Sequence, residues 1–215
     1  MIKLVWITPN ADEMIAQMAR VSNPNKDQEH ETAPRLINYM IRNKHWSPFD
    51  MADMCVEIKT VRDIGRQILR HSSFNFQEFS QRYADVGLLD DAPVREARMQ
   101  HPTNRQSSIP CGDAIIVKWW NEVQQAMIRK ATDCYNSALE LGIAKEVARA
   151  ILPEGLTPTR MYMKGTIRSW IHFCEVRRHP STQKETRDIA ELCWAIMEQE
   201  CPMIAQAVGM PTLPK

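Results

Sequence analysis

The feature of this sequence that most constrains its fold is the order in which short alternating segments and longer amphipathic segments follow one another. In residues 54–60, for example, Val56 and Ile58 alternate with Glu57 and Lys59, which is typical of a half-buried strand. The segments with a strand pattern are 3–8, 54–60 and 159–165. The segments with a helical period begin near residues 10, 32, 60, 113, 144, 166 and 182. This interleaving predicts an α+β fold with a mixed or antiparallel sheet flanked by long helices.

Several residues mark where these helices begin and end. Asn10 is expected to cap the first helix, with Met18 on its apolar face, and Thr166 to cap the helix that follows it. Gly142 is expected to end the long helix that starts near residue 113. Residues 84–110 are rich in proline, aspartate and other polar residues, and they predict a long ordered loop. A last long helix is expected to begin near residue 182.

Length and composition predict a single domain over residues 1–215, large enough to bury a sizeable core. The formal net charge is +1, so no bulk field draws the chain toward nucleic acid or a membrane, and an anion site must be a local cluster of arginines. No apolar run reaches spanning length and the N-terminus has no signal-peptide pattern, so we expect a cytoplasmic chain. The six cysteines are scattered without a C-x-x-C pair, which indicates reduced thiols. No glycine loop for a nucleotide and no metal-ligand spacing occurs, so no metal site is expected.

Residues 70–83, RHSSFNFQEFSQRY, place charged residues among aromatic ones. A helix is predicted to end at Arg70 and His71, and an extended run would then point Glu78, Ser80 and Arg82 to one side, because side chains alternate along a strand. The planar guanidinium of arginine stays charged and can donate two parallel hydrogen bonds to a phosphate, so these residues suggest an anion-binding site. The alternative is an internal ion-pair network that joins Glu78 to Arg82 or Arg70.

Three further patterns carry polar residues that could serve a site. Arg149 lies in a short helix and could equally be a surface arginine. Arg168 and His172 are four residues apart on one helix face, where His172 could contact a planar ligand or be satisfied by Glu175 or the backbone. Arg177 lies roughly opposite Arg168 on that helix, so the two would serve different parts of a composite site.

A serine hydrolase that uses Ser80 and His71 is a different hypothesis. Ser80 has no G-x-S-x-G elbow and no neighbouring glycine, so the sequence gives this hypothesis little support.

Taken in order, these segments resemble the flavin-dependent thymidylate synthases. That family has a signature of Arg-His-Arg, seven residues, Ser, one residue and Arg, which appears here as Arg70-His71-Ser72 followed by Ser80-Gln81-Arg82. The segments ARVSNP, KHWSPF, KEVARAILP and GTIRSWIHFCEVR resemble the family in the family's order, and the resemblance spans roughly residues 14–200.

The resemblance implies conversion of dUMP to dTMP, with methylenetetrahydrofolate as carbon donor, NADPH as reductant and FAD as hydride carrier. It implies a homotetramer with FAD bound across subunit interfaces in a fold that is not a Rossmann fold. The expected partners are these small molecules, with no stable nucleic acid and no membrane. The expected location is the cytoplasm, or the host cytoplasm if the source is viral.

The resemblance also implies roles for individual residues. Arg177 matches an arginine that favours the N3-deprotonated uracil, which makes it the expected catalytic residue, and His45 matches a histidine on the folate side. The expected dUMP contacts are Gln67, Arg70, Glu78, Ser80, Arg82, Arg149 and Arg177. The expected FAD contacts are Ser47, Arg70, His71, Ser72, Glu78, Thr166, Arg168 and His172.

Two residues depart from the family pattern. Ser72 replaces the second arginine of the signature and removes a guanidinium donor from the flavin side, and Asp50 stands where a glutamate is expected. The Ser72 departure leaves one alternative open: a non-catalytic nucleotide- or RNA-binding relative that has lost its affinity for flavin.

Overall fold

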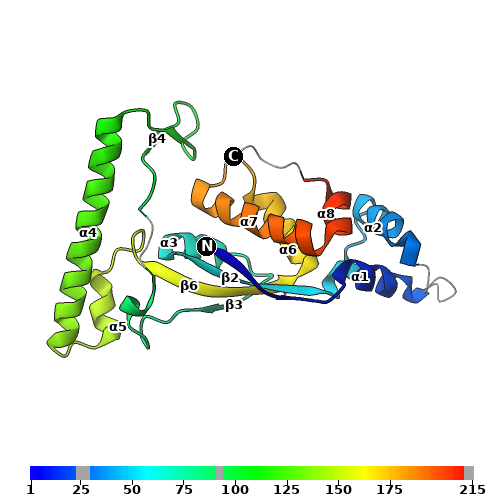
Figure 1. Ribbon diagram of the computed structural model, residues 1–215, viewed down its shortest axis with the longest axis horizontal. Helices are drawn as coiled ribbons and strands as arrows, with labels where there is room; N and C mark the ends of the chain where they lie inside the picture. Colours follow the sequence, from blue (N-terminus) through cyan, green and yellow to red (C-terminus); the bar gives the residue numbers. More distant parts are fainter. Residues whose placement is uncertain (23–29, 91–93, 211–215) are drawn as a thin grey trace.

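The computed structural model describes residues 1–22, 30–90 and 94–210, and its centre is a four-stranded sheet with strand order β1-β2-β6-β3 (Figure 1). All neighbouring strands of this sheet are antiparallel. The strands are β1 (Ile2–Ile7), β2 (Asp53–Val61), β6 (Pro158–Thr166) and β3 (Asn75–Glu78). β2 and β6 pair along their full lengths, and β3 forms one edge. The predicted α+β class with an antiparallel sheet is confirmed.

The helices gather over one face of the sheet and at its two ends (Figure 1). Over the sheet lie α3 (Arg62–Ile68), α6 (Ile167–Arg177) and α7 (Lys184–Glu200). At one end lie α1 (Ala11–Ala19), α2 (Ala33–Arg42) and α8 (Pro202–Val208). At the other end lie α4 (Ala114–Glu140) and α5 (Lys145–Ala148).

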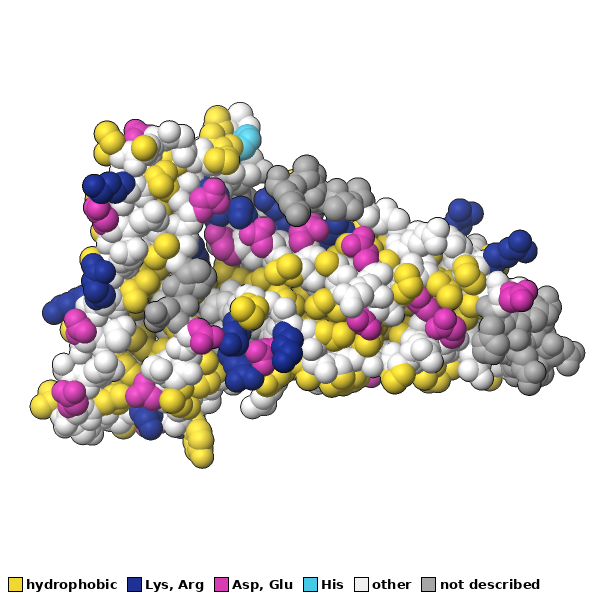
Figure 2. All heavy atoms as spheres, in the orientation of Figure 1, with side chains coloured by type: hydrophobic (Ala, Val, Ile, Leu, Met, Phe, Trp, Pro, Cys, Tyr) yellow, Lys and Arg dark blue, Asp and Glu magenta, His cyan; other side chains and the backbone are white. Residues whose placement is uncertain are grey.

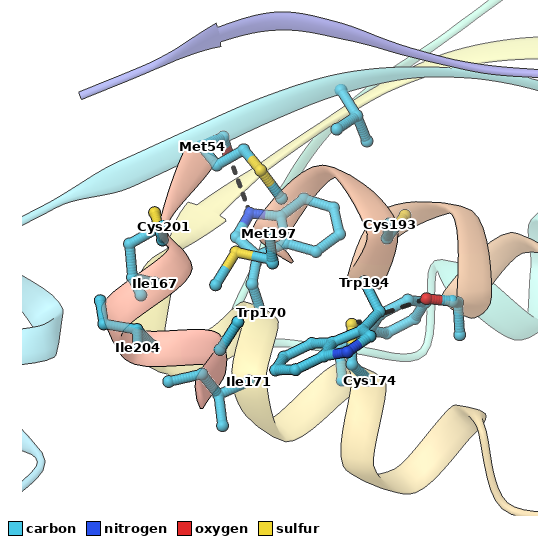
Figure 3. Close-up of a cluster of buried hydrophobic side chains, with 14 of the residues drawn as sticks. Met54, Ile167, Trp170, Ile171, Cys174, Cys193, Trp194, Met197, Cys201 and Ile204 are labelled. Carbon is cyan, nitrogen blue, oxygen red and sulfur yellow. Dashed lines mark hydrogen bonds between the residues drawn. The ribbon is translucent and has the colours of Figure 1, made fainter. Parts of the chain in front are cut away.

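The core forms where the alternating residues of β2 and β6 face these helices. Met54 and Met163 are fully buried on that face, whereas Glu57 and Arg160 lie on the open face and form an ion pair of 2.6 Å. Trp170 of α6 is fully buried and its indole N–H donates to the Met54 carbonyl oxygen at 3.0 Å (Figure 3). This bond satisfies the one polar atom of the indole and fixes α6 on the sheet.

Two details of α1 differ from the prediction. Asn10 adopts a left-handed backbone conformation with φ of 50°, and its side chain does not cap the helix. The buried face is centred on Ile15, while Met18 is 38% exposed. The buried face of α1 is therefore narrower than the apolar face that its sequence predicts.

The predicted long helix is present as α7, and Pro202, which cannot continue its hydrogen-bond ladder, begins the separate helix α8. Asp12 of α1 is buried beside this break and accepts hydrogen bonds from the backbone N–H groups of Met203 (2.8 Å) and Ile204 (3.2 Å). Burial raises the pKa of Asp12. The first and last helices are therefore joined by this carboxyl group.

The segment 84–110 is not a plain loop: it contains an antiparallel hairpin of β4 (Arg98–Gln100) and β5 (Ser108–Pro110). The long helix α4 follows as predicted. Its first turn is capped by the Asp113 carboxylate, which accepts from the N–H groups of Ile115 and Ile116, and Gly142 ends it with φ of 83°.

The six cysteines are unpaired, as predicted, and four of them are buried. Within the described ranges, none of the helices has the length and apolar character needed to cross a bilayer. No cluster of three or more His, Cys, Asp or Glu side chains in those ranges has an arrangement that could hold a metal ion.

Candidate active site

The centre of the candidate site is a contact between the turn after α3 and the last turn of α6. α3 ends at Ile68, and the turn that follows directs His71 toward Arg177, whose Nε donates to His71 Nε2 at 2.7 Å. The imidazole packs edge-on against Phe173, with ring centroids 4.9 Å apart. Burial, followed by the charge of Arg177, lowers the pKa of His71 to about 4. His71 is therefore neutral near pH 7 and accepts the hydrogen bond.

Arg70 adds a second positive charge beside Arg177. Burial and the charge of Arg70 lower the pKa of Arg177. Among the described residues, neither guanidinium forms an ion pair with a carboxylate. The two guanidiniums repel each other, and the neutral imidazole of His71 does not offset their charge. An anionic ligand bound beside them would relieve this repulsion.

Gln67, the third predicted residue of this group, is held by the start of α7. Its amide N–H donates to Gln183 Oε1 at 2.7 Å, and its Oε1 accepts from the hydroxyl of Thr186 at 2.9 Å. Thr186 is fully buried, whereas Gln67 and Gln183 are half-buried, so the network is anchored at its Thr186 end. Gln67, Arg70, His71 and Arg177 form what we call the α3–α6 cluster.

A cavity of about 460 Å³ opens beside this cluster and contains two of the predicted flavin contacts, Arg168 and His172. Arg168 donates to Asp50 at 2.9 Å, and the Thr166 hydroxyl donates to the other oxygen of Asp50 at 3.0 Å. The predicted cap is also present, since Thr166 Oγ1 accepts from the N–H of Ser169. The remaining lining residues are Trp46, Ser73, Ile171 and Glu175.

The other residues predicted near this cavity are exposed. His172 lines the cavity with Glu175 but forms no hydrogen bond with it, so that alternative is not observed. His45 and Ser47 flank Trp46, and Ser47 begins the 3₁₀ turn η4 (Ser47–Asp50). Ser72 is exposed in the turn before β3, next to the lining residue Ser73.

The donor set fits a flavin dinucleotide in chemical terms. Trp46 offers apolar surface for a flat ring, and Arg168 keeps guanidinium donors beyond the one bound by Asp50. The hydroxyls of Ser73 and Ser169 add polar contacts at the same wall.

Glu78, Ser80 and Arg82 do not form one row as predicted, because β3 ends at Glu78 and the chain turns at Ser80. Glu78 is engaged internally, as the ion-pair alternative proposed, but with other partners: it accepts from Thr159 at 2.8 Å and pairs with Arg62 at 3.5 Å.

Ser80 and Arg82 are exposed and belong to a second group, the α5 cluster, with Arg149. Both arginines contact Glu146 of α5. Arg82 pairs with its carboxylate at 3.3 Å, and Arg149 Nε donates to its carbonyl oxygen at 3.2 Å.

Arg70 precedes β3 and Arg82 follows it, and an extended strand of four residues spans about 13 Å. Among the described residues, no hydrogen bond or ion pair joins the α3–α6 cluster to the α5 cluster. The structure gives no support to a Ser80–His71 hydrolase pair, because Ser80 lies beyond β3 and His71 Nε2 accepts from Arg177.

No local sequence pattern indicates the partners that hold these side chains. Gln183 and Thr186 orient Gln67, and Asp50 orients both Arg168 and Thr166. The departure at Asp50 was visible in the sequence, whereas no spacing relates Gln67 to residues more than one hundred positions further along the chain.

The fold and the site define a class of nucleotide-modifying α+β proteins. The chain superposes on the UMP/dUMP methylase PolB from Streptomyces cacaoi, solved with 5-Br dUMP bound, with a TM-score of 0.82 and 25% identity; the match covers 96% of this chain and 93% of that one. The family model described as "Thymidylate synthase complementing protein" matches residues 3–203.

Two curated relatives define the family more closely. The chain is 48% identical to the "Probable flavin-dependent thymidylate synthase" of Paramecium bursaria Chlorella virus 1, over 92% of this chain and 90% of the relative. It is 47% identical to the flavin-dependent thymidylate synthase of Synechocystis sp., over 91% and 88%. The chain therefore belongs to the family of flavin-dependent thymidylate synthases, as its motifs predict. Nothing in these comparisons supports a non-catalytic relative.

Proposed function

We propose that this chain catalyses the reductive methylation of dUMP to dTMP, with methylenetetrahydrofolate as carbon donor, NADPH as reductant and FAD as hydride carrier. The observation that carries this proposal is the α3–α6 cluster. It holds two guanidiniums that pair with no carboxylate of the described residues, beside a neutral imidazole and next to a cavity that suits a flavin.

Arg177 is the catalytic residue in this proposal. Loss of the N3 proton makes C5 of the uracil electron-rich, and C5 must attack the methylene carbon. A fixed cation beside the ring stabilises the charge as it develops. His71 accepts only from Nε of Arg177, so the two terminal NH₂ groups stay available to the substrate.

The flavin would be held by side chains around the 460 Å³ cavity. When bound, FAD supplies the hydride chemistry of the reaction. Arg168, oriented by Asp50, binds an anionic part of the cofactor, and Trp46 provides the apolar wall. The other proposed contacts are Ser47, Arg70, His71, Ser72, Glu78, Thr166 and His172. His45, which is exposed beside Trp46, faces the folate side.

The α5 cluster binds the phosphate of dUMP. Arg82 and Arg149 supply guanidinium forks and Ser80 a hydroxyl, which together suit a phosphate better than a single cation does. Gln67, Arg70 and Glu78 complete the proposed contacts to the nucleotide. Because β3 keeps the two clusters apart within one chain, the complete site forms where the α5 cluster of one subunit meets the α3–α6 cluster of another.

The proposed assembly is a homotetramer. The separated clusters require at least two subunits at each site, and α4 offers an apolar surface for such contacts. On this helix Ile115 is 80% exposed, Trp119 59% and Met127 52%. Figure 2 shows hydrophobic side chains along the α4 end of the molecule. Exposed apolar patches of this kind mark protein interfaces. We place the enzyme in the cytoplasm, or in the host cytoplasm if its source is viral, because its unpaired cysteines suit a reducing compartment.

The visible spectrum of the purified protein tests the proposal. We expect a flavin spectrum that NADPH bleaches and that dUMP with methylenetetrahydrofolate restores, with dTMP as the product. Absence of dTMP when FAD is supplied in excess would overturn it.

A further inference from the structure

A second cavity, of about 390 Å³, lies between the β4–β5 hairpin and the beginning of α7. In Figure 1 the hairpin stands beside α4 and faces the end of α7 that begins at Lys184, and in Figure 2 basic and acidic side chains gather around this seam. Its volume falls within the range of small-molecule sites. Its lining is polar, and none of the residue roles proposed above uses it.

The cavity is positively charged. Four basic side chains line it against one acidic one, Glu96, and the basic residues are Arg98, Arg105, Lys184 and Arg187. Two of the four charges are neutralised by neighbours, because Arg98 pairs with Glu185 at 2.6 Å and Lys184 pairs with Asp188 at 2.9 Å.

The other two arginines have no carboxylate partner among the described residues. Arg105 makes no hydrogen bond or ion pair with a described residue, and Arg187 donates only to the carbonyl oxygen of Pro180, at 3.1 Å. Guanidiniums gathered in one cavity repel each other, and a bound anion relieves that repulsion. The unpaired charges therefore favour a ligand with phosphate or carboxylate groups.

The loop that carries Arg105 is ordered before any ligand arrives. The side-chain amide of Gln100 donates to the carbonyl oxygens of Asn104 (3.0 Å) and Ser107 (3.1 Å), so it closes the loop from inside. The Nδ1 atom of His101 accepts from the N–H of Asn104 at 3.1 Å. These bonds place Arg105 at the cavity at little cost in entropy when a ligand binds.

The cavity is connected to the candidate active site through one residue. Gln183 lines the cavity, and the same side chain accepts from Gln67 of the α3–α6 cluster at 2.7 Å. A molecule that reacts next to Arg177 would cross this pair of side chains to reach Arg105 and Arg187. The phosphate of dUMP is assigned to the α5 cluster, which leaves the two co-substrates.

We infer that this cavity binds the anionic tail of a co-substrate, far from the atoms that react. The inference rests on the proposed function. NADPH carries phosphates and methylenetetrahydrofolate carries glutamate carboxylates, and both present the anionic chemistry that paired arginines recognise. The inference assigns Arg105 and Arg187 as the residues that bind this tail.

Fragments that lack the reacting end separate the two sources. The probes are 2′,5′-ADP for the dinucleotide and tri-γ-glutamate for the folate tail, each titrated calorimetrically into the enzyme saturated with FAD and dUMP. We expect one probe to bind the wild-type protein and to bind Arg105→Gln/Arg187→Gln at least about tenfold more weakly. The matched control is Arg35→Gln/Arg42→Gln, which removes two exposed arginines of α2 at the far end of the molecule and should bind as wild type does.

Arg105→Gln alone provides the second measurement, because this side chain supports no described residue and its loss should leave the fold intact. It should raise KM for the co-substrate whose fragment binds, by about three- to tenfold, and leave KM for dUMP at its wild-type value. The inference is overturned if neither fragment binds, or if the double variant binds both as well as the control does. Failure of the wild-type protein to form dTMP would instead overturn the proposed function. The fragment titration measures binding to the cavity and does not depend on turnover, so the two failures can be told apart.

Discussion

Arg177 Nε donates a hydrogen bond of 2.7 Å to Nε2 of His71, which joins the last turn of α6 to the turn after α3. Since Nε2 accepts this bond, the neutral imidazole carries its proton on Nδ1. The edge-on contact with Phe173 restrains the ring from the other side. The guanidinium is thus fixed by a neutral partner that does not neutralise its charge, as expected of a cation that must stabilise a developing anion.

Replacing Arg177 by alanine should reduce kcat far more than it weakens dUMP binding. The proposed charge matters most as the anionic ring develops, so we expect kcat to fall about 100- to 1000-fold. The dissociation constant for dUMP should rise less than about tenfold. Single-turnover kinetics and equilibrium titration with dUMP measure the two effects. Equal losses in both would mean that Arg177 only anchors the substrate, and Arg35→Ala serves as the control.

The pH dependence of stability should report the contact between His71 and Arg177. The pKa of His71 is lowered to about 4 from its ordinary value of 6.5, so the unfolded chain binds the proton more readily than the folded chain between these values. The free energy of unfolding should therefore fall as the pH drops from about 6.5 to about 4 and be unaffected by this group above 6.5. We expect a loss on the order of 1–2 kcal/mol, below the full shift because the ring is only half-buried.

His71→Gln tests this expectation, because the glutamine side chain keeps an acceptor and does not titrate. Urea unfolding at several pH values should show a shallower fall for this variant than for the wild type. His179→Gln removes an exposed histidine that contacts Ser181 and should follow the wild-type curve. If His71→Gln follows it too, the contact does not respond to pH.

Much of the fold follows from local patterns. The alternation of Val56 and Ile58 with polar neighbours identified β2, and Asp113 and Gly142 lie at the ends of α4 where capping chemistry requires them. The predictions that were wrong concern features that depend on contacts between distant segments of the chain. No local pattern shows that β3 stops at Glu78 or that residues 84–110 contain a hairpin.

The candidate site likewise combines features that local sequence patterns predict with features that depend on contacts between distant segments. The residue types in the segment 70–83 suggested an anion-binding site, and the resemblance implied the role of Arg177. The structure places His71 of that segment in contact with Arg177. The ion pair of Glu78 with Arg62 was not foreseen, because it depends on how β3 sits beside α3 and β6.

Ser72→Arg should tighten FAD binding. Ser72 is exposed next to the lining residue Ser73, so an arginine there can reach the flavin cavity without displacing core atoms. One added charge-assisted contact should lower the dissociation constant about tenfold, measured by flavin fluorescence. Ser72→Ala should leave the affinity near the wild-type value. An unchanged or weaker affinity in Ser72→Arg would show that the serine costs the enzyme nothing.

Asp50→Ala should weaken FAD binding with little effect on stability. Asp50 holds both Arg168 and Thr166, and the ion pair with Arg168 is partly exposed to solvent, so its loss should cost no more than about 1 kcal/mol in the free energy of unfolding. The freed guanidinium would lose its orientation, and we expect the dissociation constant for FAD to rise about three- to tenfold. Asp50→Asn keeps the shape and should lose less. A large stability loss would show that Asp50 serves the fold first.

Gly165→Ala should disturb the site through the core. A Cβ atom on Gly165 would lie 2.5 Å from Cδ1 of the Phe74 ring, which is 6% exposed and packs edge-on against Trp170 with centroids 4.8 Å apart. The ring must move to admit the methyl group, and Phe74 lies only three residues after His71. We expect the free energy of unfolding to fall by about 1–3 kcal/mol, and activity to fall more than in variants with equal loss of stability elsewhere. Gly112→Ala is the control, since a Cβ there meets nothing within 4 Å. Thermal unfolding and dTMP formation measured on the same samples decide the case: a stability loss without a further loss of activity would mean that the turn carrying His71 tolerates a displaced Phe74.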